Sequence, residues 1–456
     1  SGLGTQIGTL FTGSPACADD VILMTFQQEQ LQALLNTAAE YASEHKYSLH
    51  PKKTIITKLV STRGKSEVIN SRVWKIADTP VTTDDSFVHL GLKWDSGKGR
   101  VDVNHNILKA RRMAYSLLKT GLHGVNGLDP PAAVKIIQCY VTPKLLHGLE
   151  ATVLRKEDLQ SLCQTYIKML RQIQGLPQNC AVEFIYLLIG AIPLEGQLHQ
   201  KSLALFGNIC RLPREHMLYK LAERQLAVSA HSKHSWFASI CNIGDIYGLN
   251  VHKNLKFPKS KLEWKREVKT AVKLHWGTKL VTAARDKSTL CWFIPNINLI
   301  HHSLWDSCRG ETRMVEASTC RARMLSGRFM TQKLRAEFSS TNTSASCKLC
   351  RAEVEDIAHI LVRCKALEGH RRSGIAKIIE YYEEHGTRPP VDKDELCSAI
   401  LNGNCYVGSK AHGLRPIEIP QDGRSQINKL CSLLCHKLAR ERDYLLQKLV
   451  LDNQEE

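Results

Sequence analysis

Four side chains that commonly bind metal stand close together in the stretch CKLCRAEVEDIAHILVRC. Cys347, Cys350, His359 and Cys364 follow the pattern C-x2-C-x8-H-x4-C. The first two cysteines form a tight knuckle whose sulfurs can converge on one ion, and a short helix or turn is expected to bring in the other two ligands. Three thiolates and one imidazole complete a tetrahedral shell with no open position. The spacing therefore predicts structural zinc rather than a catalytic metal.

The competing interpretation is that these four residues are unrelated and simply buried. The tight CxxC pair and the polar linker SSTNTSAS at 339–346 favour zinc. Cys431, Cys435 and His436 also lie near one another, but they belong to an amphipathic helical stretch, 425–449. We interpret them as packing residues.

Length and charge limit the class of protein. A chain of 456 residues is too long for one ordinary core, so two to four domains are expected. Lys and Arg number 62 and Asp and Glu number 44, which gives a net charge of +18. A surplus of this size favours a polyanionic partner such as nucleic acid, although a merely basic surface is the alternative.

The 16 cysteines are scattered along the chain, and the opening SGLGTQIGTL has no secretory signal pattern. This combination favours a reducing, intracellular compartment. The longest apolar stretch, FIYLLIGAIPL at 184–194, is too short for a membrane helix and contains Pro193. We therefore expect no membrane partner.

Hydrophobic periodicity predicts an α+β fold. Residues 1–26 are expected to form two short strands around a turn, the second being the buried apolar run VILMTF. A helix should follow, with a capping box made by Thr25 and Gln28 and an apolar stripe that includes Leu34 and Leu35. YSLHPKKTIITKLVS and DSFVHLGLKWD are expected to contain strands. From about residue 104 to about 340, helical patterns dominate.

Two adjacent carboxylates, Asp19 and Asp20, lie within GSPACADDVILM, at the predicted turn. Oxygen ligands held this close together suit Mg²⁺. In phosphoryl transfer, two such ions activate the attacking oxygen and stabilise the leaving one. A solvated Asp-Asp turn is the competing interpretation, since such turns are common.

The order of these segments resembles the palm of a reverse transcriptase from a non-LTR (LINE-type) retrotransposon. CADDVILM is similar to the family's Tyr/Phe-Ala-Asp-Asp box, with Cys17 where an aromatic residue is usual. LHPKKT resembles the next motif, so Lys52 or Lys53 would lie near the phosphates of the incoming nucleotide. HLGLKWD resembles the primer-grip turn, matched by Leu90, Gly91 and Leu92.

The resemblance extends to later segments of the chain. The helical stretch after residue 104 looks like the thumb, which holds the template–primer duplex, and C-x2-C-x8-H-x4-C resembles the zinc module that follows the polymerase in many of these elements. Basic residues of the thumb and of the segment before the zinc module would contact phosphates, with a solvated helix face as the alternative for the second group. These are Lys109, Arg111, Arg112, Arg321, Arg323, Arg328, Lys333 and Arg335.

The resemblance implies the following domains: the C-terminal part of a palm at 1–100, a helical thumb at 101–180, a helical linker region at 181–340, the zinc module at 341–370 and a helical tail at 371–456. The family's polymerase needs a third carboxylate from an earlier strand, and only 18 residues precede Asp19. We therefore expect the chain to be the C-terminal portion of an RNA-directed DNA polymerase, with Mg²⁺ and Zn²⁺ as cofactors and an incomplete Mg²⁺ site.

Its expected partners are an RNA template, a DNA primer and, in the complete enzyme, a dNTP, and its expected location is the nucleus or cytoplasm. The first alternative is a non-catalytic nucleic-acid-binding zinc protein derived from such an element. The second is a structural zinc protein that binds no nucleic acid.

Overall fold

A computed structural model of the protein describes residues 2–59, 73–95, 99–124, 127–228, 235–340, 343–385, 388–403, 406–407, 415–416 and 421–452. The chain divides into two compact units, each built from segments that are distant in sequence. The first unit comprises Ser1–Ala110, Pro143–Leu162 and Leu198–Lys269. The second comprises Arg111–Thr142, Cys163–Gln197 and Thr270–Glu456.

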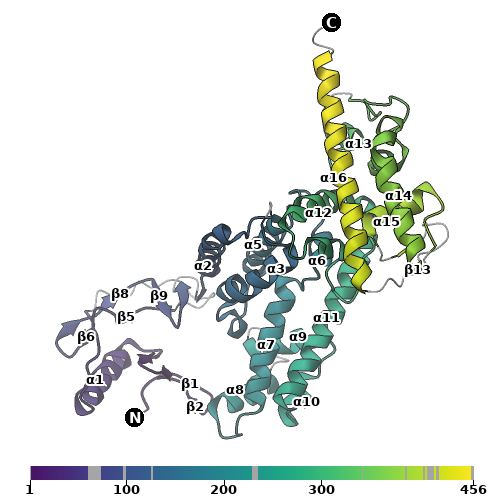
Figure 1. Ribbon diagram of the computed structural model, residues 1–456. Helices are drawn as coiled ribbons and strands as arrows, with labels where there is room; N and C mark the ends of the chain where they lie inside the picture. The colour runs from purple at the N-terminus through teal and green to yellow at the C-terminus, as the bar shows by residue number, and fades with distance from the viewer. Residues whose placement is uncertain are drawn as a thin grey trace. The chain divides into compact units, whose positions relative to one another are not determined.

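Helices and strands are both present, which confirms the α+β class in its coarse form, and most strands precede residue 102 (Figure 1). Most strands are two residues long and pair as small ladders rather than as one continuous sheet. Their bounds are β1 Gln6–Ile7, β2 Leu10–Phe11, β3 Ala16–Cys17, β4 Asp20–Val21, β5 Ile55–Ile56, β6 Lys75–Ile76, β7 Thr79–Pro80, β8 Thr82–Thr83, β9 Ser86–His89, β10 Leu92–Asp95, β11 Arg100–Val101, β12 Tyr406–Val407 and β13 Arg415–Pro416. The palm remains a prediction.

The strand pairing is almost entirely antiparallel. Strands β1 and β2, β3 and β4, and β6 and β7 form hairpins, and β11, β10 and β9 form a three-stranded sheet in that order. Strands β5 and β8 pair in parallel. The run after Asp20 is less buried than expected, because Val21 is 51% exposed. Within that run, Leu23 packs against a small apolar core.

That small core lies beneath helix α1, which spans Gln28–Glu44. The helix predicted after residue 25 is therefore confirmed, although it ends before the segment YSLHPKKT that contains Pro51. Its buried members are Leu35, Ile56, Trp74, Ile76 and Val81. The expected capping box is not formed. Gln27 is the N-cap residue and makes no side-chain cap bond, and the Thr25 hydroxyl instead donates to the Gln30 side chain at 2.9 Å. The Thr25 hydroxyl is therefore bonded to a side chain and does not cap a backbone N–H of the first helical turn.

Helices make up the rest of the first unit, together with the parts of longer helices that fall within its segments. Trp264 donates from its indole nitrogen to the Leu203 carbonyl at 2.8 Å, and Gly207 leaves room for that ring. His199 and the Tyr247 hydroxyl lie 2.8 Å apart. The helices α2 Val103–Ser116, α4 Thr142–Leu146, α5 Lys156–Ile173, α7 Leu194–Cys210, α8 Met217–Ala227, α9 Trp236–Ile246, α10 Val251–Lys256 and α11 Lys261–Arg285 contribute residues here.

In the second unit, the apolar stretch noted in the sequence forms helix α6, Val182–Ile189, and residues 184–189 are all buried. Among the described helices, none is both long and apolar enough to span a bilayer. Other elements of this unit are α3 Pro130–Ile136, the π-helical turn η2 Ile137–Val141, the 3-10 turn η5 Ser303–Cys308, α12 Thr312–Leu325, α13 Gln332–Phe338, the π-helical turn η6 His359–Arg363, the 3-10 turn η7 Lys365–Leu367, α14 Glu368–Glu384 and α15 Lys393–Asn402.

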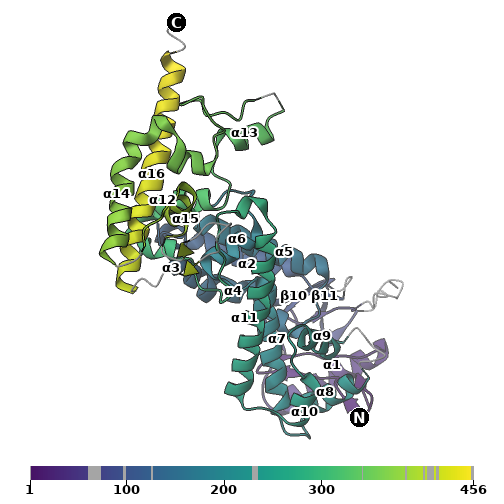
Figure 2. The same ribbon diagram turned by 90° about the vertical axis from the view of Figure 1, so that its right-hand side faces the viewer.

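The long helix α16, Gln421–Asp452, lies alongside α12 and α14 in both ribbon views (Figures 1 and 2). The side chains of Ile427, Cys431, Cys435 and Leu438 on α16 are completely buried. This confirms that the two cysteines are packing residues. The stripe that the sequence showed along this segment is therefore the face that closes the core of the second unit.

Candidate functional site

The four cysteine and histidine side chains of the predicted zinc module come together in the second unit. Their ligand atoms all lie within 4.8 Å of one another. The sulfurs of Cys347 and Cys364 are 3.9 Å apart, and the Cys350 sulfur is 3.4 Å from His359 Nε2. Ligands of a tetrahedral zinc ion, with bonds of about 2.3 Å to sulfur and about 2.0 Å to nitrogen, are separated by about 3.8 and 3.5 Å. The cluster therefore has dimensions that fit a closed metal centre.

Backbone N–H groups surround the three thiols. Burial raises the pKa of the Cys347 thiol to about 12. The N–H groups of Cys350 and Leu349 act in the opposite direction and lower this pKa, but by less. Burial also raises the pKa of the Cys364 thiol. For Cys350, burial acts in the same direction but is outweighed by hydrogen bonds, the first from the Ala352 N–H, so its pKa lies below the ordinary value. N–H donors stabilise the thiolate form that binds a metal.

The histidine ring is oriented by a carboxylate outside the cluster. His359 Nδ1 lies 3.2 Å from Glu353 Oε2, while its Nε2 faces the thiols. A carboxylate can only accept here, so Nδ1 carries the proton and the Nε2 lone pair is free for a metal. His359 is 1% exposed, whereas the Glu353 side chain is 55% exposed. Sequence analysis missed Glu353, although it lies inside the same cysteine–histidine stretch.

A buried ion pair joins this module to α16. Arg442 of α16 donates to Glu355 Oε1 at 2.6 Å, and the two side chains are only 2% and 1% exposed. The same carboxylate oxygen accepts the Gln332 N–H at 2.8 Å. Two segments distant in sequence are thereby held against the loop that follows the first cysteine pair.

The predicted magnesium ligands have a different setting. Asp20 lies on β4, paired with Cys17, and Asp19 occupies the turn beside Ala18, whose φ is 54°. Both aspartates are exposed. Across the described ranges, the Cys347 cluster is the one group of three or more His, Cys, Asp or Glu side chains within metal-binding reach. Within those ranges, no third His, Cys, Asp or Glu ligand joins this pair.

The two lysines of the LHPKKT motif are also exposed. Lys52 and Lys53 lie in the turn that leads to β5, where the Lys53 and Thr54 N–H groups donate to the His50 carbonyl. The predicted primer-grip residues form the β9–β10 turn. Leu90 and Gly91 have φ values of 48° and 78°, and Leu92 opens β10. Two successive positive φ values are typical of a type I′ hairpin turn.

Two side chains from later in the chain hold that turn. Lys109 donates to the Gly91 carbonyl at 3.0 Å, and His147 Nε2 lies 2.9 Å from the Leu90 carbonyl. The Lys109 ammonium, expected to contact phosphate, therefore has a structural partner within the first unit. Sequence analysis gave no sign of His147, since 57 residues separate it from Leu90.

The other two thumb residues predicted to contact phosphates are open to solvent. Arg111 and Arg112 are both exposed on α2. Arg111 lines a cleft of about 330 Å³ in the second unit, together with Tyr115 of the same helix and Lys168 of α5. Tyr115 is 65% exposed. Two cations and an exposed aromatic ring therefore share this cleft. Lys168 was not among the basic residues that the sequence predicted to contact phosphate.

The basic residues before the zinc module separate into two groups. Arg321 is completely buried and donates to the Leu401 carbonyl at 3.0 Å and to Asn428 Oδ1 at 2.9 Å. It therefore holds α12, α15 and α16 together and does not reach a phosphate here. Arg328 is half-buried near the Phe338 ring. The residues Arg323, Lys333 and Arg335 are exposed.

Comparison with known proteins leaves the family open: no protein-family model matches the chain, and no curated protein matches it.

Proposed function

We propose that this chain binds nucleic acid and is stabilised by zinc, as the C-terminal portion of a non-LTR retrotransposon reverse transcriptase. The observation that carries the proposal is the closed Cys₃His centre, formed in the order and spacing that resemble the zinc module of that family. Cys347, Cys350, His359 and Cys364 would hold Zn²⁺. Their closed arrangement gives the metal a structural role, because it leaves no position for a substrate.

The cleft with Arg111, Lys168 and Tyr115 is the proposed contact for the RNA–DNA duplex. Guanidinium and ammonium groups pair with phosphates, and an exposed aromatic ring can stack on a sugar or base. The net charge of +18 adds long-range attraction for a polyanion.

Asp19 and Asp20 would supply two of the Mg²⁺ ligands in the polymerase. There the 3′ hydroxyl of a primer would lose its proton and attack the α-phosphate of a dNTP, which breaks the α–β phosphoanhydride bond and releases pyrophosphate. Lys52 or Lys53 would pair with the phosphates. Mg²⁺ would offset the negative charge on the phosphate oxygens during this attack. The exposed hairpin leaves both carboxylates accessible, and within the described ranges no third His, Cys, Asp or Glu ligand lies beside them.

The second candidate is a non-catalytic nucleic-acid-binding zinc protein. It is favoured by the aspartate pair, which no third ligand joins in the described part of the chain. The two candidates differ in one result: the polymerase requires both aspartates for DNA synthesis, whereas the binding protein retains all its activity when both are changed to Asn.

The first test measures binding of a labelled RNA–DNA duplex by fluorescence anisotropy at several salt concentrations. Arg111→Gln together with Lys168→Gln should weaken binding and reduce the slope of log K against log salt by about 1 to 2. Lys265→Gln with Lys269→Gln, two exposed lysines of α11, is the control of equal charge change. If the chain binds no RNA, DNA or hybrid at low salt, the proposal is wrong and a purely structural zinc protein is favoured.

A further inference from the structure

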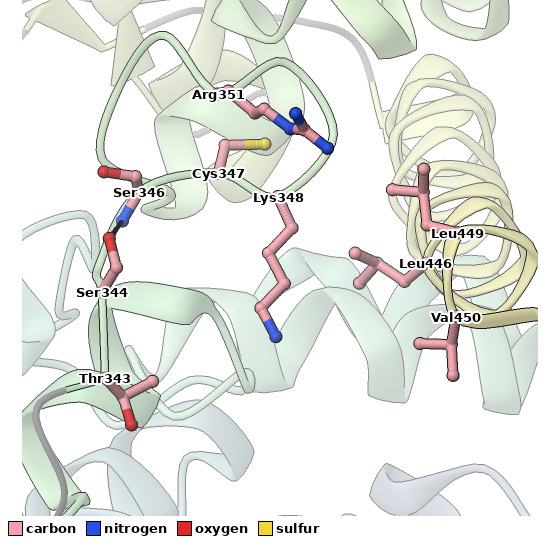
Figure 3. A pocket seen from close by; sticks show the side chains of 9 residues that line it. All are labelled: Thr343, Ser344, Ser346, Cys347, Lys348, Arg351, Leu446, Leu449 and Val450. Carbon is pink, nitrogen blue, oxygen red and sulfur yellow. Dashed lines mark hydrogen bonds between the residues drawn. The ribbon is translucent and has the colours of Figure 1, made fainter. Parts of the chain in front are cut away.

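A cleft of about 350 Å³ lies beside the metal-binding cluster, between the knuckle loop and the last turns of α16 (Figure 3). One wall comes from residues 343–351, including Lys348 and Arg351. The other comes from Leu446, Leu449 and Val450, which project from the helix toward that loop. The metal ligand Cys347 also lines the cleft, so the shape of the cleft depends on the knuckle.

The loop wall carries positive charge that the described residues leave unbalanced. Lys348 and Arg351 are both exposed, and no ion pair joins either one to another side chain in the described ranges. None of the residues that line the cleft is acidic. An occupant with carboxylates or phosphates would complement this wall.

The helix wall is apolar and continues the face of α16 that is buried elsewhere. Leu446, Leu449 and Val450 are spaced i, i+3, i+4, so they lie on one side of the helix. Leu438, two turns earlier, is completely buried, but Val450 is 58% exposed. An apolar helix face that extends past its own core into a cleft is typical of a surface that a partner covers.

The backbone of the knuckle gives a second, independent observation. Arg351 has φ 56°, in the left-handed region that glycine adopts without strain and other residues adopt at a cost of about 1 kcal/mol. Its N–H donates to the Cys347 carbonyl at 2.8 Å, which fixes this conformation. Glycine would suit the fold better, so the arginine side chain is expected to serve another purpose.

We propose that this cleft docks an acidic, amphipathic helical segment of a partner protein. The carboxylates of that segment pair with Lys348 and Arg351, and its apolar side chains pack on Leu446, Leu449 and Val450. The aliphatic wall favours a peptide over nucleic acid, because single strands are usually held by stacking on aromatic rings, and no aromatic residue lines this cleft. The site is distinct from the Arg111 cleft and does not depend on duplex binding.

The test uses the full, zinc-loaded chain and a fluorescein-labelled synthetic peptide with leucines at i, i+3, i+4 and i+7 and glutamates between them. Arg351→Glu and Leu446→Glu should each weaken peptide binding about tenfold or more. Lys377→Glu, an exposed residue of α14 outside the cleft, should have little effect. A scrambled peptide of the same composition should bind much more weakly, since it lacks an apolar stripe.

Arg351→Gly separates binding from folding. It relieves the backbone strain, so the melting temperature should stay the same or rise, while peptide affinity falls as in Arg351→Glu. The proposal is overturned if the peptide binds Arg351→Glu and Leu446→Glu as well as it binds the unaltered chain. It is also overturned if labelled oligouridine, and not the peptide, loses affinity on Arg351→Glu, because the cleft would then be a nucleic-acid site.

Discussion

The aspartate hairpin and the cysteine–histidine centre both present metal-ligating side chains, but in opposite surroundings. Asp19 and Asp20 are exposed on a ladder of two-residue strands. Cys347, His359 and Cys364 are each about 1% exposed and are held by N–H donors and a carboxylate. The closed centre forms because its ligands lie in one short segment. A hard-ion site that uses only two adjacent carboxylates needs ligands from elsewhere to become complete.

The largest expected effect comes from emptying the closed centre. Cys364→Ser should abolish binding of about one zinc per chain and lower the free energy of unfolding by at least about 3 kcal/mol, because metal-binding energy is folding energy at such a site. Metal analysis and calorimetry measure the two quantities. Cys139→Ser, at an exposed cysteine, is the matched control. If the metal-free chain is as stable as the unaltered chain, metal binding at the cysteine–histidine centre contributes nothing to folding, and the two regions do not differ in this respect.

Breaking the buried Glu355–Arg442 pair should have the next largest effect. Glu355→Gln leaves the buried Arg442 guanidinium with only the exposed Asp443 carboxylate as an ion-pair partner, at a cost of about 3 kcal/mol in unfolding free energy. The exposed pair Lys259–Glu267 is the control, and Glu267→Gln should cost less than about 1 kcal/mol. Denaturant titration measures both. If the two variants lose equal amounts of unfolding free energy, burial does not make the Glu355–Arg442 pair more important for stability than an exposed pair.

Arg321 and Arg335 looked equivalent in sequence, and their variants sharpen the distinction between closed and open surroundings. Arg321→Met should destabilise the protein by about 3 kcal/mol, since the Leu401 carbonyl and the Asn428 side chain lose a buried donor. Arg335→Met should change stability by less than about 0.5 kcal/mol. Chemical unfolding provides the values, and a stability loss at Arg335 as large as at Arg321 would contradict the assignment.

His302 allows a test of burial by pH. Burial, followed by the charge of Arg321, lowers its pKa from 6.5 to about 3. As pH falls from about 6.5 toward 3, His302 therefore gains a proton in the unfolded chain but stays neutral in the folded chain. The free energy of unfolding falls in that window by up to about 1.4 kcal/mol per pH unit.

His302→Asn keeps an acceptor for the Leu304 N–H and removes the titrating group. Between pH 7 and pH 4, the free energy of unfolding of this variant should fall less steeply than that of the unaltered chain. The two slopes should differ by up to about 1.4 kcal/mol per pH unit, the value for one proton. Parallel curves for the variant and the unaltered chain would mean that His302 titrates normally.

The smallest stability effect is expected at the open hairpin. Asp19→Asn with Asp20→Asn should shift the free energy of unfolding by less than about 0.5 kcal/mol, since both side chains face solvent. The same variant should lose any weak Mn²⁺ binding, measured by paramagnetic broadening of nearby resonances. A large loss of stability would show that the hairpin is as closed as the cysteine centre.

The members of the cysteine–histidine cluster could be predicted because spacing along one short segment limits which side chains can meet. The helix at 28–44 and the packing role of Cys431 and Cys435 followed from periodicity. The partner of Glu355 could not be predicted, because Arg442 lies 87 residues away. The arginines of 321–335 could not be sorted either, since nothing local tells which of them faces the interior.

Residue types and their local spacing were enough to predict the Cys₃His composition of the cluster, the excess of positive charge and the helical character of the chain after residue 104. These properties depend on side-chain type and on spacing over a few turns. Three other properties depend on how distant segments pack: which charges are buried, that Lys109 holds the Leu90–Gly91 turn, and that the end of α16 faces the knuckle across a cleft. Burial is a property of segments packed together from distant parts of the chain, and it decides whether a charge supports the fold or remains available to a partner.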